Sequence, residues 1–204
     1  MITEEGLIWE RFREYTCKIK FLKENPMRGG DFDSYEYEDD NPEHFYKSAV
    51  DPKYGYKKIE TINYKNKTFF LYGISDNGGF DIKIIPENVK TIVGNISFVE
   101  DGDGIKINSV YNQPLYKGIV YYLIFNYFLK KYDFVISGDV QSNKGERFWE
   151  KILQFGFLNK EKFKITVINS YTGETYDINN FDDVGGYYGD EPSFEKYRFK
   201  IENI

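Results

Sequence analysis

Residues 110–123 read Val-Tyr-Asn-Gln-Pro-Leu-Tyr-Lys-Gly-Ile-Val-Tyr-Tyr-Leu, and they join two elements of different kinds. The alternating residues of 104–111 indicate a β-strand, which Pro114 ends because proline cannot continue the hydrogen-bond ladder of a strand. After the proline, apolar residues recur at intervals of three and four up to residue 132, which predicts an amphipathic helix. The stretch therefore predicts a strand that passes through a short turn directly into a helix.

The segments around this stretch extend the pattern into a mixed α/β fold. A second helix is expected over residues 142–155, ended by Gly156. Residues 25–56 have no such periodicity and are expected to form a loop. The order, β-rich first and then β-α-β-α-β, predicts an α/β mixed sheet with a central strand-helix-strand-helix core. Short alternating or apolar runs bounded by turn residues predict further strands at 67–75, 80–85, 91–100, 133–138, 163–168 and 197–201.

The helix start at Lys117 and Gly118 is a possible anion site by its physical chemistry alone. The first N–H groups of a helix have no partner inside the helix, and the helix dipole adds partial positive charge there. Such an end can hold a pyrophosphate. The alternative is an ordinary strand-to-helix turn, and this segment by itself does not decide between the two.

The residues of this turn and of the second helix resemble the GCN5-related N-acetyltransferases, the GNAT family. Residues 114–118, Pro-Leu-Tyr-Lys-Gly, match the Pro-x-Tyr-Arg-Gly pattern of that family. In the second helix, residues 148–152, Phe-Trp-Glu-Lys-Ile, resemble Leu-Tyr-Glu-Lys-Leu and are followed by Gly156-Phe157. The resemblance covers residues 91–157, and it is greatest to the divergent GNAT-like proteins that phages encode.

The resemblance implies a GNAT-like fold and acetyl-CoA as the cofactor, with transfer of its acetyl group to an amine acceptor. In that family the strand separates from its neighbour where the helix begins, and its main-chain groups hold the pantetheine arm and the thioester. A family asparagine near the start of the second helix falls on Ser142, and Asn143 takes its place with a shift of one residue. The cofactor-binding positions implied in this way are Val110, Asn112, Lys117, Gly118, Ile119, Val120, Tyr121, Tyr122 and Asn143.

Two residues are candidates for proton transfer if the chain is an enzyme. Glu100, near the end of the preceding strand, is the candidate general base, because a carboxylate can accept the proton of the amine through water. Its alternative role is that of a solvated acid before a turn. Tyr111 is the candidate acid for the leaving thiolate.

Three departures from the family pattern lead to a different hypothesis. Val120 and Tyr122 stand where the family has glycines that let the phosphates approach the backbone. Trp149 stands where the family often has a tyrosine acid, and an indole cannot donate a proton in this way. The alternative function is therefore a catalytically degenerate GNAT-fold protein that acts by binding a protein, such as a phage inhibitor of a host protein.

The first 50 residues are expected to form a separate N-terminal part with a helix over 4–16, a strand over 17–22 and an acidic loop, before a GNAT-like domain over 51–204. Residues 31–43 hold seven acidic residues and no basic residue. Such a run is typical of a solvated loop. It could also face a basic protein or a cationic amine, and imitation of DNA is a third, weaker interpretation.

The overall composition narrows the classes of partner. The 204 residues carry 27 Lys and Arg against 33 Asp and Glu, so the net charge is −6 and a broad nucleic-acid surface is not expected. No apolar run is long enough to span a bilayer, and the acidic start does not resemble a signal peptide. We therefore expect a cytoplasmic protein without membrane contact, located in the host cytoplasm if a phage encodes it. The single cysteine, Cys17, and the single histidine, His44, argue against a disulfide framework and a multi-histidine metal site.

Overall fold

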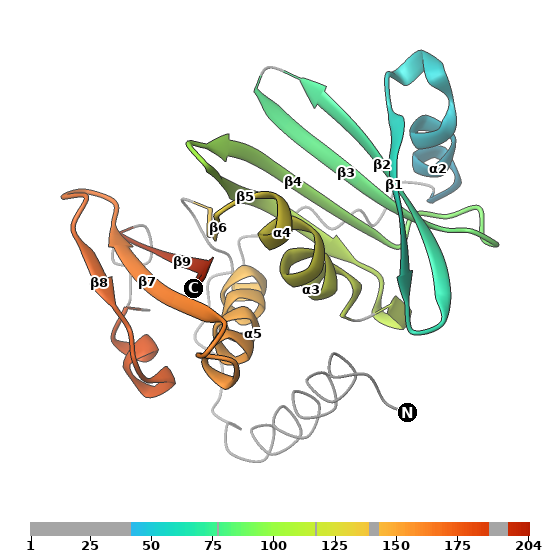
Figure 1. The fold of residues 1–204 in the computed structure, drawn as a ribbon. Coiled ribbons are helices and arrows are strands. Elements are labelled where there is room, and N and C mark those ends of the chain that lie inside the picture. Colours follow the sequence, from blue (N-terminus) through green and yellow to red (C-terminus); the bar gives the residue numbers. More distant parts are fainter. Residues whose placement is uncertain (1–41, 77, 117, 139–142, 188–195) are drawn as a thin grey trace. The chain divides into compact units, whose positions relative to one another are not determined.

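The chain divides into two compact units, residues 1–34 and 35–204. The computed structural model describes residues 42–76, 78–116, 118–138, 143–187 and 196–204, all in the second unit (Figure 1). The helix and the strand predicted before residue 25, Cys17, and most of the acidic run lie outside the described residues. The side chain of His44 is also outside them.

The described strands form one sheet in the order β1-β2-β3-β4-β5-β6-β9-β7-β8. All neighbouring pairs in it are antiparallel except β5 and β6, which are parallel. The prediction of a mixed α/β sheet is therefore confirmed. The strands are β1 (Lys57–Tyr64), β2 (Lys67–Asp76), β3 (Gly79–Pro86), β4 (Gly94–Asp101), β5 (Gly104–Asn112), β6 (Phe134–Ile136), β7 (Phe163–Asn169), β8 (Thr175–Asp177) and β9 (Tyr197–Asn203).

The helix predicted after Pro114 is present but contains a wider turn. The Leu129 N–H donates to the Ile124 carbonyl, five residues back, which is the bond of a π-helical turn. The described helical elements are α2 (Pro42–Val50), η1 (Pro52–Tyr54), η2 (Pro114–Tyr116), α3 (Ile119–Leu123), η3 (Ile124–Phe128), α4 (Leu129–Lys131), α5 (Asn143–Leu158) and η4 (Phe181–Gly186). We call the continuous run α3-η3-α4 the central helix.

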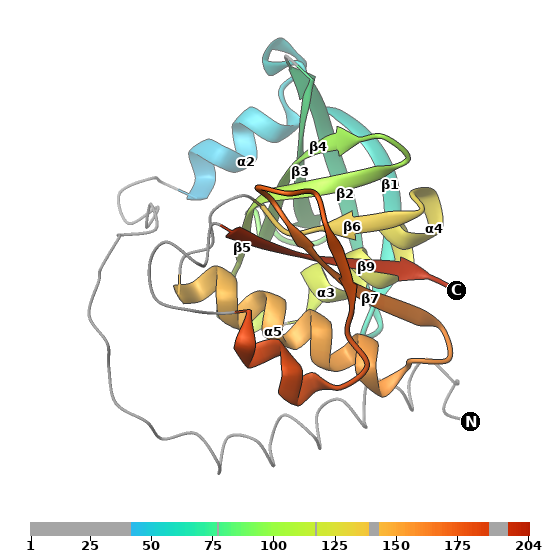
Figure 2. The same ribbon diagram turned by 90° about the vertical axis from the view of Figure 1, so that its left-hand side faces the viewer.

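The two faces of the antiparallel strands are covered by different helices (Figure 2). On one face, Ala49 of α2 packs with Ile85 and Ile92. On the other face, Phe128 of the central helix contacts the ring of Phe98 on β4, with the ring centres 5.1 Å apart. Because side chains alternate along a strand, β3, β4 and β5 each contribute to both faces.

Several described elements differ from the sequence-based expectation, and among these β8 and η4 were not predicted. α2 lies in a segment predicted to be a loop and before the predicted domain boundary at residue 51, although it packs on the sheet. β1 was not predicted, because its first five residues are exposed and the sequence there shows no regular alternation of polar and apolar residues. The second helix continues through Gly156 to Leu158.

Gly156 has a packing role in place of the predicted helix-ending role. A Cβ atom on this residue would lie 2.8 Å from Ile165 Cδ1 and 2.9 Å from Ile201 Cδ1. The glycine therefore lets α5 approach β7 and β9 closely, and its φ does not lie in the left-handed region that a helix-ending glycine commonly adopts.

Candidate functional site

The parallel pair β5 and β6 is joined at one end only. Its register includes Ile105 opposite Val135 and Lys106 opposite Ile136, and no further pairs. After β6, the Ser137 N–H donates to the Phe199 carbonyl at 2.9 Å, so the chain continues along β9. β5 itself runs on to Asn112. We call the side of β5 that faces away from β4, over residues 107–112, the open edge, because no described strand pairs with it.

The register identifies which main-chain groups face the open edge. Asn112 stands opposite Gly94 on β4, and the next residue, Gln113, donates its N–H to the Val93 carbonyl at 2.9 Å. In an antiparallel pair, residues that bond to the partner strand alternate with residues whose N–H and C=O point away from it. Tyr111 therefore bonds toward β4, whereas the N–H and C=O groups of Val110 and Asn112 point toward the open edge.

The Asn112 side chain projects from the sheet face opposite to that of Tyr111. Its Oδ1 atom is buried and has no hydrogen-bond partner among the described residues. A buried acceptor without a donor is costly and uncommon in folded proteins.

The turn after the open edge depends on Gly118. Its φ of 97° is in the left-handed region, and the Tyr122 N–H donates to its carbonyl at 2.9 Å as a first helical bond. A Cβ at this position would collide with the Tyr64 hydroxyl. The protein's own packing therefore requires this glycine, independently of any cofactor.

Two neighbouring tyrosines of α3 point to different partners. The Tyr121 ring stacks on the Phe148 ring of α5, with centres 5.0 Å apart and planes 24° apart. Burial raises the pKa of the Tyr121 phenol well above its usual range. The Tyr122 ring contacts Tyr64 of β1, with centres 5.2 Å apart. The Tyr121–Phe148 stack thus joins the central helix to α5.

Val120 and Trp149, which depart from the GNAT pattern, are both almost completely buried, with 1% and 3% of their surfaces exposed. Ile119 is fully buried as well. These side chains therefore form part of the interior of the protein. Trp149 also contacts the Phe148 ring edge-on, at 6.2 Å between centres.

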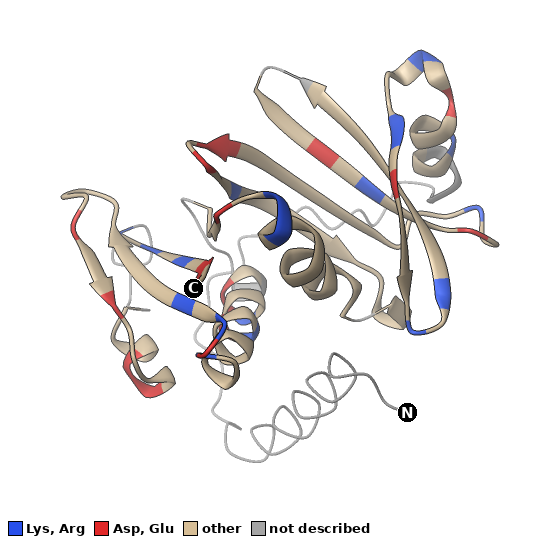
Figure 3. Ribbon diagram, viewed as in Figure 1, with Lys and Arg blue, Asp and Glu red and all other residues tan. Residues whose placement is uncertain are grey.

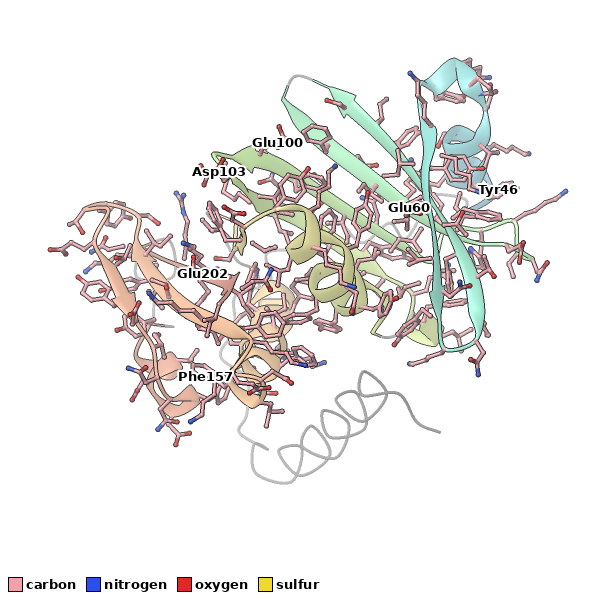
Figure 4. The ribbon with its side chains drawn as sticks, in the orientation of Figure 1. Tyr46, Glu60, Glu100, Asp103, Phe157 and Glu202 are labelled. Atoms are coloured by element: carbon pink, nitrogen blue, oxygen red, sulfur yellow. The ribbon has the colours of Figure 1, made fainter. Side chains whose placement is uncertain are left out.

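Glu100 lies away from the open edge. It stands opposite Ile105, at the end of β5 that is joined to β6, beside the hairpin turn that contains Asp103 (Figure 4). Ile96, which stands opposite Val110, is four residues away along β4, or about 13 Å at the usual rise of a strand. The structure therefore does not bring the candidate base to the main-chain groups that the resemblance assigns to the thioester.

Glu100 has a local partner instead. The Tyr132 hydroxyl donates to Glu100 Oε1 at 3.3 Å. Burial, followed by the charge of Glu100 and this hydrogen bond, raises the pKa of the Tyr132 phenol to about 12. The pair links the end of the central helix to the end of β4.

Tyr111, the candidate acid, belongs to the strand that carries the open edge. It stands opposite Asn95, so its side chain lies on the sheet face covered by α2. Its surface is 38% exposed. Of the two candidate catalytic residues, Tyr111 is therefore the one placed near Val110 and Asn112. Lys117 and the side chain of Asn143 lie outside the described residues, although the backbone of Asn143 begins α5.

The β1–β2 hairpin is a part of the site that the sequence analysis missed. Its two turn residues, Lys65 and Asn66, have positive φ values of 50° and 59°. The hairpin brings Tyr64 against Gly118 and places the Lys67 ammonium 5.5 Å from the centre of the Tyr116 ring. A two-residue turn at Lys65-Asn66 could have been predicted, because asparagine favours such turns. The contact between Tyr64 and Gly118 could not, because nothing in the sequence near either residue indicates it.

Comparison of the chain with protein-family models, with curated proteins and with solved structures finds no match. Among the described residues, no helix combines the length and the apolar character needed to cross a membrane. Within the same ranges, no three His, Cys, Asp or Glu side chains gather as a metal site would require.

Proposed function

We propose that the protein binds acetyl-CoA along the open edge of β5 and transfers the acetyl group to an amine acceptor. The observation that carries this proposal is the parallel pair that stops after Lys106 and leaves the main-chain groups of Val110 and Asn112 directed away from β4. The pantetheine arm of CoA contains two amide groups. An extended chain with amides can pair with a strand edge in the same way as another strand does.

The chain's own groups supply two of the functions that acyl transfer needs. A main-chain N–H at the open edge, from Val110 or Asn112, can donate to the thioester oxygen as negative charge develops on it. The Tyr111 phenol can donate its proton to the leaving thiolate. Only a neutral amine can form the new bond to the acetyl carbon as the carbon–sulfur bond breaks, so an acceptor that arrives as an ammonium ion first loses one proton to water. The attacking nitrogen then loses a second proton to water or to a base, and the Tyr111 phenolate regains its proton from water.

Glu100 remains a prediction for that base, and its position about 13 Å along β4 allows only an indirect role. Replacement of Glu100 by glutamine tests it directly. Loss of turnover with unchanged acetyl-CoA affinity would support the role, and unchanged turnover would contradict it.

A second candidate function is protein binding without catalysis, and the Tyr121–Phe148 stack favours it. The stack connects α3 and α5, the two helices that follow β5 and β6 in the chain. Trp149 is buried and cannot replace the family's tyrosine acid. If the stack prevents acetyl-CoA from reaching the open edge, the protein cannot catalyse acetyl transfer. Its function would then be to bind a partner, such as a basic protein, on its surface.

Titration calorimetry with acetyl-CoA separates these functions. We expect micromolar binding by the unaltered chain, and an absence of heat at millimolar acetyl-CoA would overturn the enzyme proposal. The sharpest variant is Val110→Pro, which removes an N–H that faces the open edge and that makes no bond to β4. It should weaken acetyl-CoA binding at least tenfold.

A second measurement tests the same assignment on the unaltered chain, without a substitution that could disturb the fold. Amide resonances in a two-dimensional NMR spectrum should shift on addition of acetyl-CoA at Val110 and Asn112, and much less at Tyr111, whose N–H faces β4. Equal shifts at all three amides would contradict the assignment of the edge.

A further inference from the structure

A cluster of polar side chains lies on the sheet face covered by α2, around the carboxylate of Asp81 on β3. The Tyr56 hydroxyl donates to Asp81 Oδ2 at 2.6 Å, and Asn95 Nδ2 donates to Asp81 Oδ1 at 2.7 Å. Asp81 and Asn95 are both partly exposed. We call Tyr56, Asp81 and Asn95 the Asp81 cluster.

The orientation of the Asn95 amide follows from its partner. An ionised carboxylate only accepts hydrogen bonds, so the atom that faces Asp81 must be the NH₂ group. The other atom, Asn95 Oδ1, is buried and has no hydrogen-bond partner among the described residues. The cluster therefore presents one carboxylate and one unsatisfied acceptor, and both would be satisfied by a donor with positive charge.

Lys83 is a cation beside the cluster, two residues after Asp81 on the same strand. Figure 3 shows acidic and basic residues following each other along β3. The Lys83 ammonium lies 4.4 Å from the ring centre of Tyr56 and 5.4 Å from that of Phe45, and it donates to Ser48 Oγ at 3.4 Å. Burial lowers the pKa of Lys83, and the charge of Asp81 opposes this effect. Two aromatic faces next to a carboxylate thus already hold an ammonium group.

The cluster lies close to the open edge of β5. Asn95 stands directly opposite Tyr111, and residues in such pairs have Cα atoms about 5.5 Å apart. Asp81 stands opposite Ser97, which in turn stands opposite Ser109 of β5. A molecule bound at Asp81 and Asn95 on this face could therefore extend across one strand to Tyr111 and the edge.

We propose that the Asp81 cluster binds the ammonium group of the acceptor, with Asp81 and Asn95 Oδ1 as acceptors and the rings of Tyr56 and Phe45 as its walls. This inference rests on the proposed function, because it identifies the acceptor as a cationic amine. Lys83 occupies the aromatic walls until the acceptor arrives, so binding of the acceptor displaces the Lys83 ammonium from the rings of Tyr56 and Phe45. Lys83 is thus a competitor of the ligand.

The test uses n-butylammonium chloride as the probe and n-pentanol, a neutral molecule of similar size, as its control. The side-chain amide resonance of Asn95 in the full chain should shift in a saturable manner with n-butylammonium and not with n-pentanol. No saturable shift at 100 mM, or the same shift with both compounds, would overturn the proposal.

Two variants should change this binding in opposite directions. Asp81→Asn keeps the shape of the side chain and an acceptor for Tyr56 but removes the charge, and should weaken n-butylammonium binding at least tenfold. Lys83→Met removes the competing cation and keeps the length of the side chain, and should strengthen binding at least threefold. Ser97→Ala, in the row next to Asp81, is the matched control and should change binding less than twofold. If Lys83→Met weakened binding, the displacement model would be wrong.

The same variants separate this inference from the proposed function. Acetyl-CoA affinity should be unchanged in Asp81→Asn, while the KM for n-butylamine in acetyl transfer should rise at least tenfold. Binding of n-butylammonium without any binding of acetyl-CoA would support the ammonium site and remove acetyl transfer. If acetyl-CoA binds but n-butylammonium has no saturable effect, the Asp81 cluster is not the acceptor site. The proposed binding of acetyl-CoA would then still stand.

Discussion

The two ends of β5 differ in what holds them. At the first end, the strand pairs with β4 and β6 together, the Asp133 N–H donates to the Asp103 carbonyl at 3.0 Å, and the Phe134 ring lies over Gly104. At the second end, β5 pairs with β4 alone and continues into a turn and the central helix. One strand thus has a closed end that stabilises the sheet and an open end where main-chain groups can meet a ligand.

The two candidate catalytic residues lie at different ends of β5, and only one of them is close to the open edge. Glu100 belongs to the closed end, where it binds Tyr132. Tyr111 belongs to the open end and stands beside Asn95 of the Asp81 cluster. The sequence analysis assigned Glu100 as the base and Tyr111 as the acid, and of these two only Tyr111 lies at the open end of β5.

Substitution of Gly118 should have the largest effect and should break the open end. Gly118→Ala combines a side chain at φ 97° with a collision against the Tyr64 hydroxyl, so we expect a loss of about 2–4 kcal/mol in the free energy of unfolding. Tyr64→Phe should recover part of this loss in the double variant, because the colliding atom is removed. Urea denaturation of the four proteins in the cycle measures the effect, and fully additive losses would contradict the contact.

Substitution of Gly104 should weaken the closed end by a smaller amount. Gly104→Ala places a methyl group into the Phe134 ring, and displacement of that ring should cost about 1–3 kcal/mol. Gly185→Ala is the matched control, because no more distant part of the described chain lies within 4 Å of its Cβ position, and it should change stability by less than about 0.5 kcal/mol. Equal stability of the two variants would show that Phe134 does not secure this end. Acetyl-CoA affinity should be retained in the folded Gly104→Ala protein.

Replacement of Phe148 sharpens the question of whether the open end is accessible. Phe148→Leu removes the stack on Tyr121 at a cost of about 0.5–1.5 kcal/mol beyond the lost area. If acetyl-CoA enters beside this stack, its affinity should rise several-fold, measured by calorimetry. Phe157→Leu, on the same helix but in contact with Phe181, is the control and should leave the affinity unchanged. An unchanged affinity in Phe148→Leu would place the stack outside the path of the ligand.

The smallest effect is expected at the closed end, from the Tyr132 phenol. Because its pKa in the folded protein is raised to about 12 from an ordinary value of 10, the neutral phenol favours the folded state. This stabilisation is complete below pH 10 and is lost as the pH rises through about 12. Tyr132→Phe should therefore flatten the decrease of melting temperature between pH 10 and 12. In an ultraviolet titration followed at 295 nm, the variant should lack one phenol that ionises near pH 12 in the unaltered protein. If the missing phenol is one that ionises near pH 10, the raised pKa of Tyr132 is contradicted.

The sequence was informative where the signal is local. Helical spacing after Pro114 and the alternation in β2 to β5 act over a few residues, and the corresponding elements are present. α2 was missed because only a short face of it is apolar, and Ala49 becomes a core residue only when Ile85 and Ile92 come next to it. Gly156 was misread because a glycine near the end of a helix commonly ends it, and its contact with Ile165 and Ile201 involves other segments.

By itself, the sequence determined the turn at Pro114 and the order of the elements with a strong local pattern, which are β2 to β5, the central helix, β6, α5, β7 and β9. Only the tertiary structure decided that β6 leaves β5 after Lys106, that Tyr64 meets Gly118, and that Asp81, Asn95 and Tyr56 share one face of the sheet. The physical reason is that periodicity encodes which side of a segment is buried. Which distant segment covers that side, and in which register, depends on packing across the whole sheet.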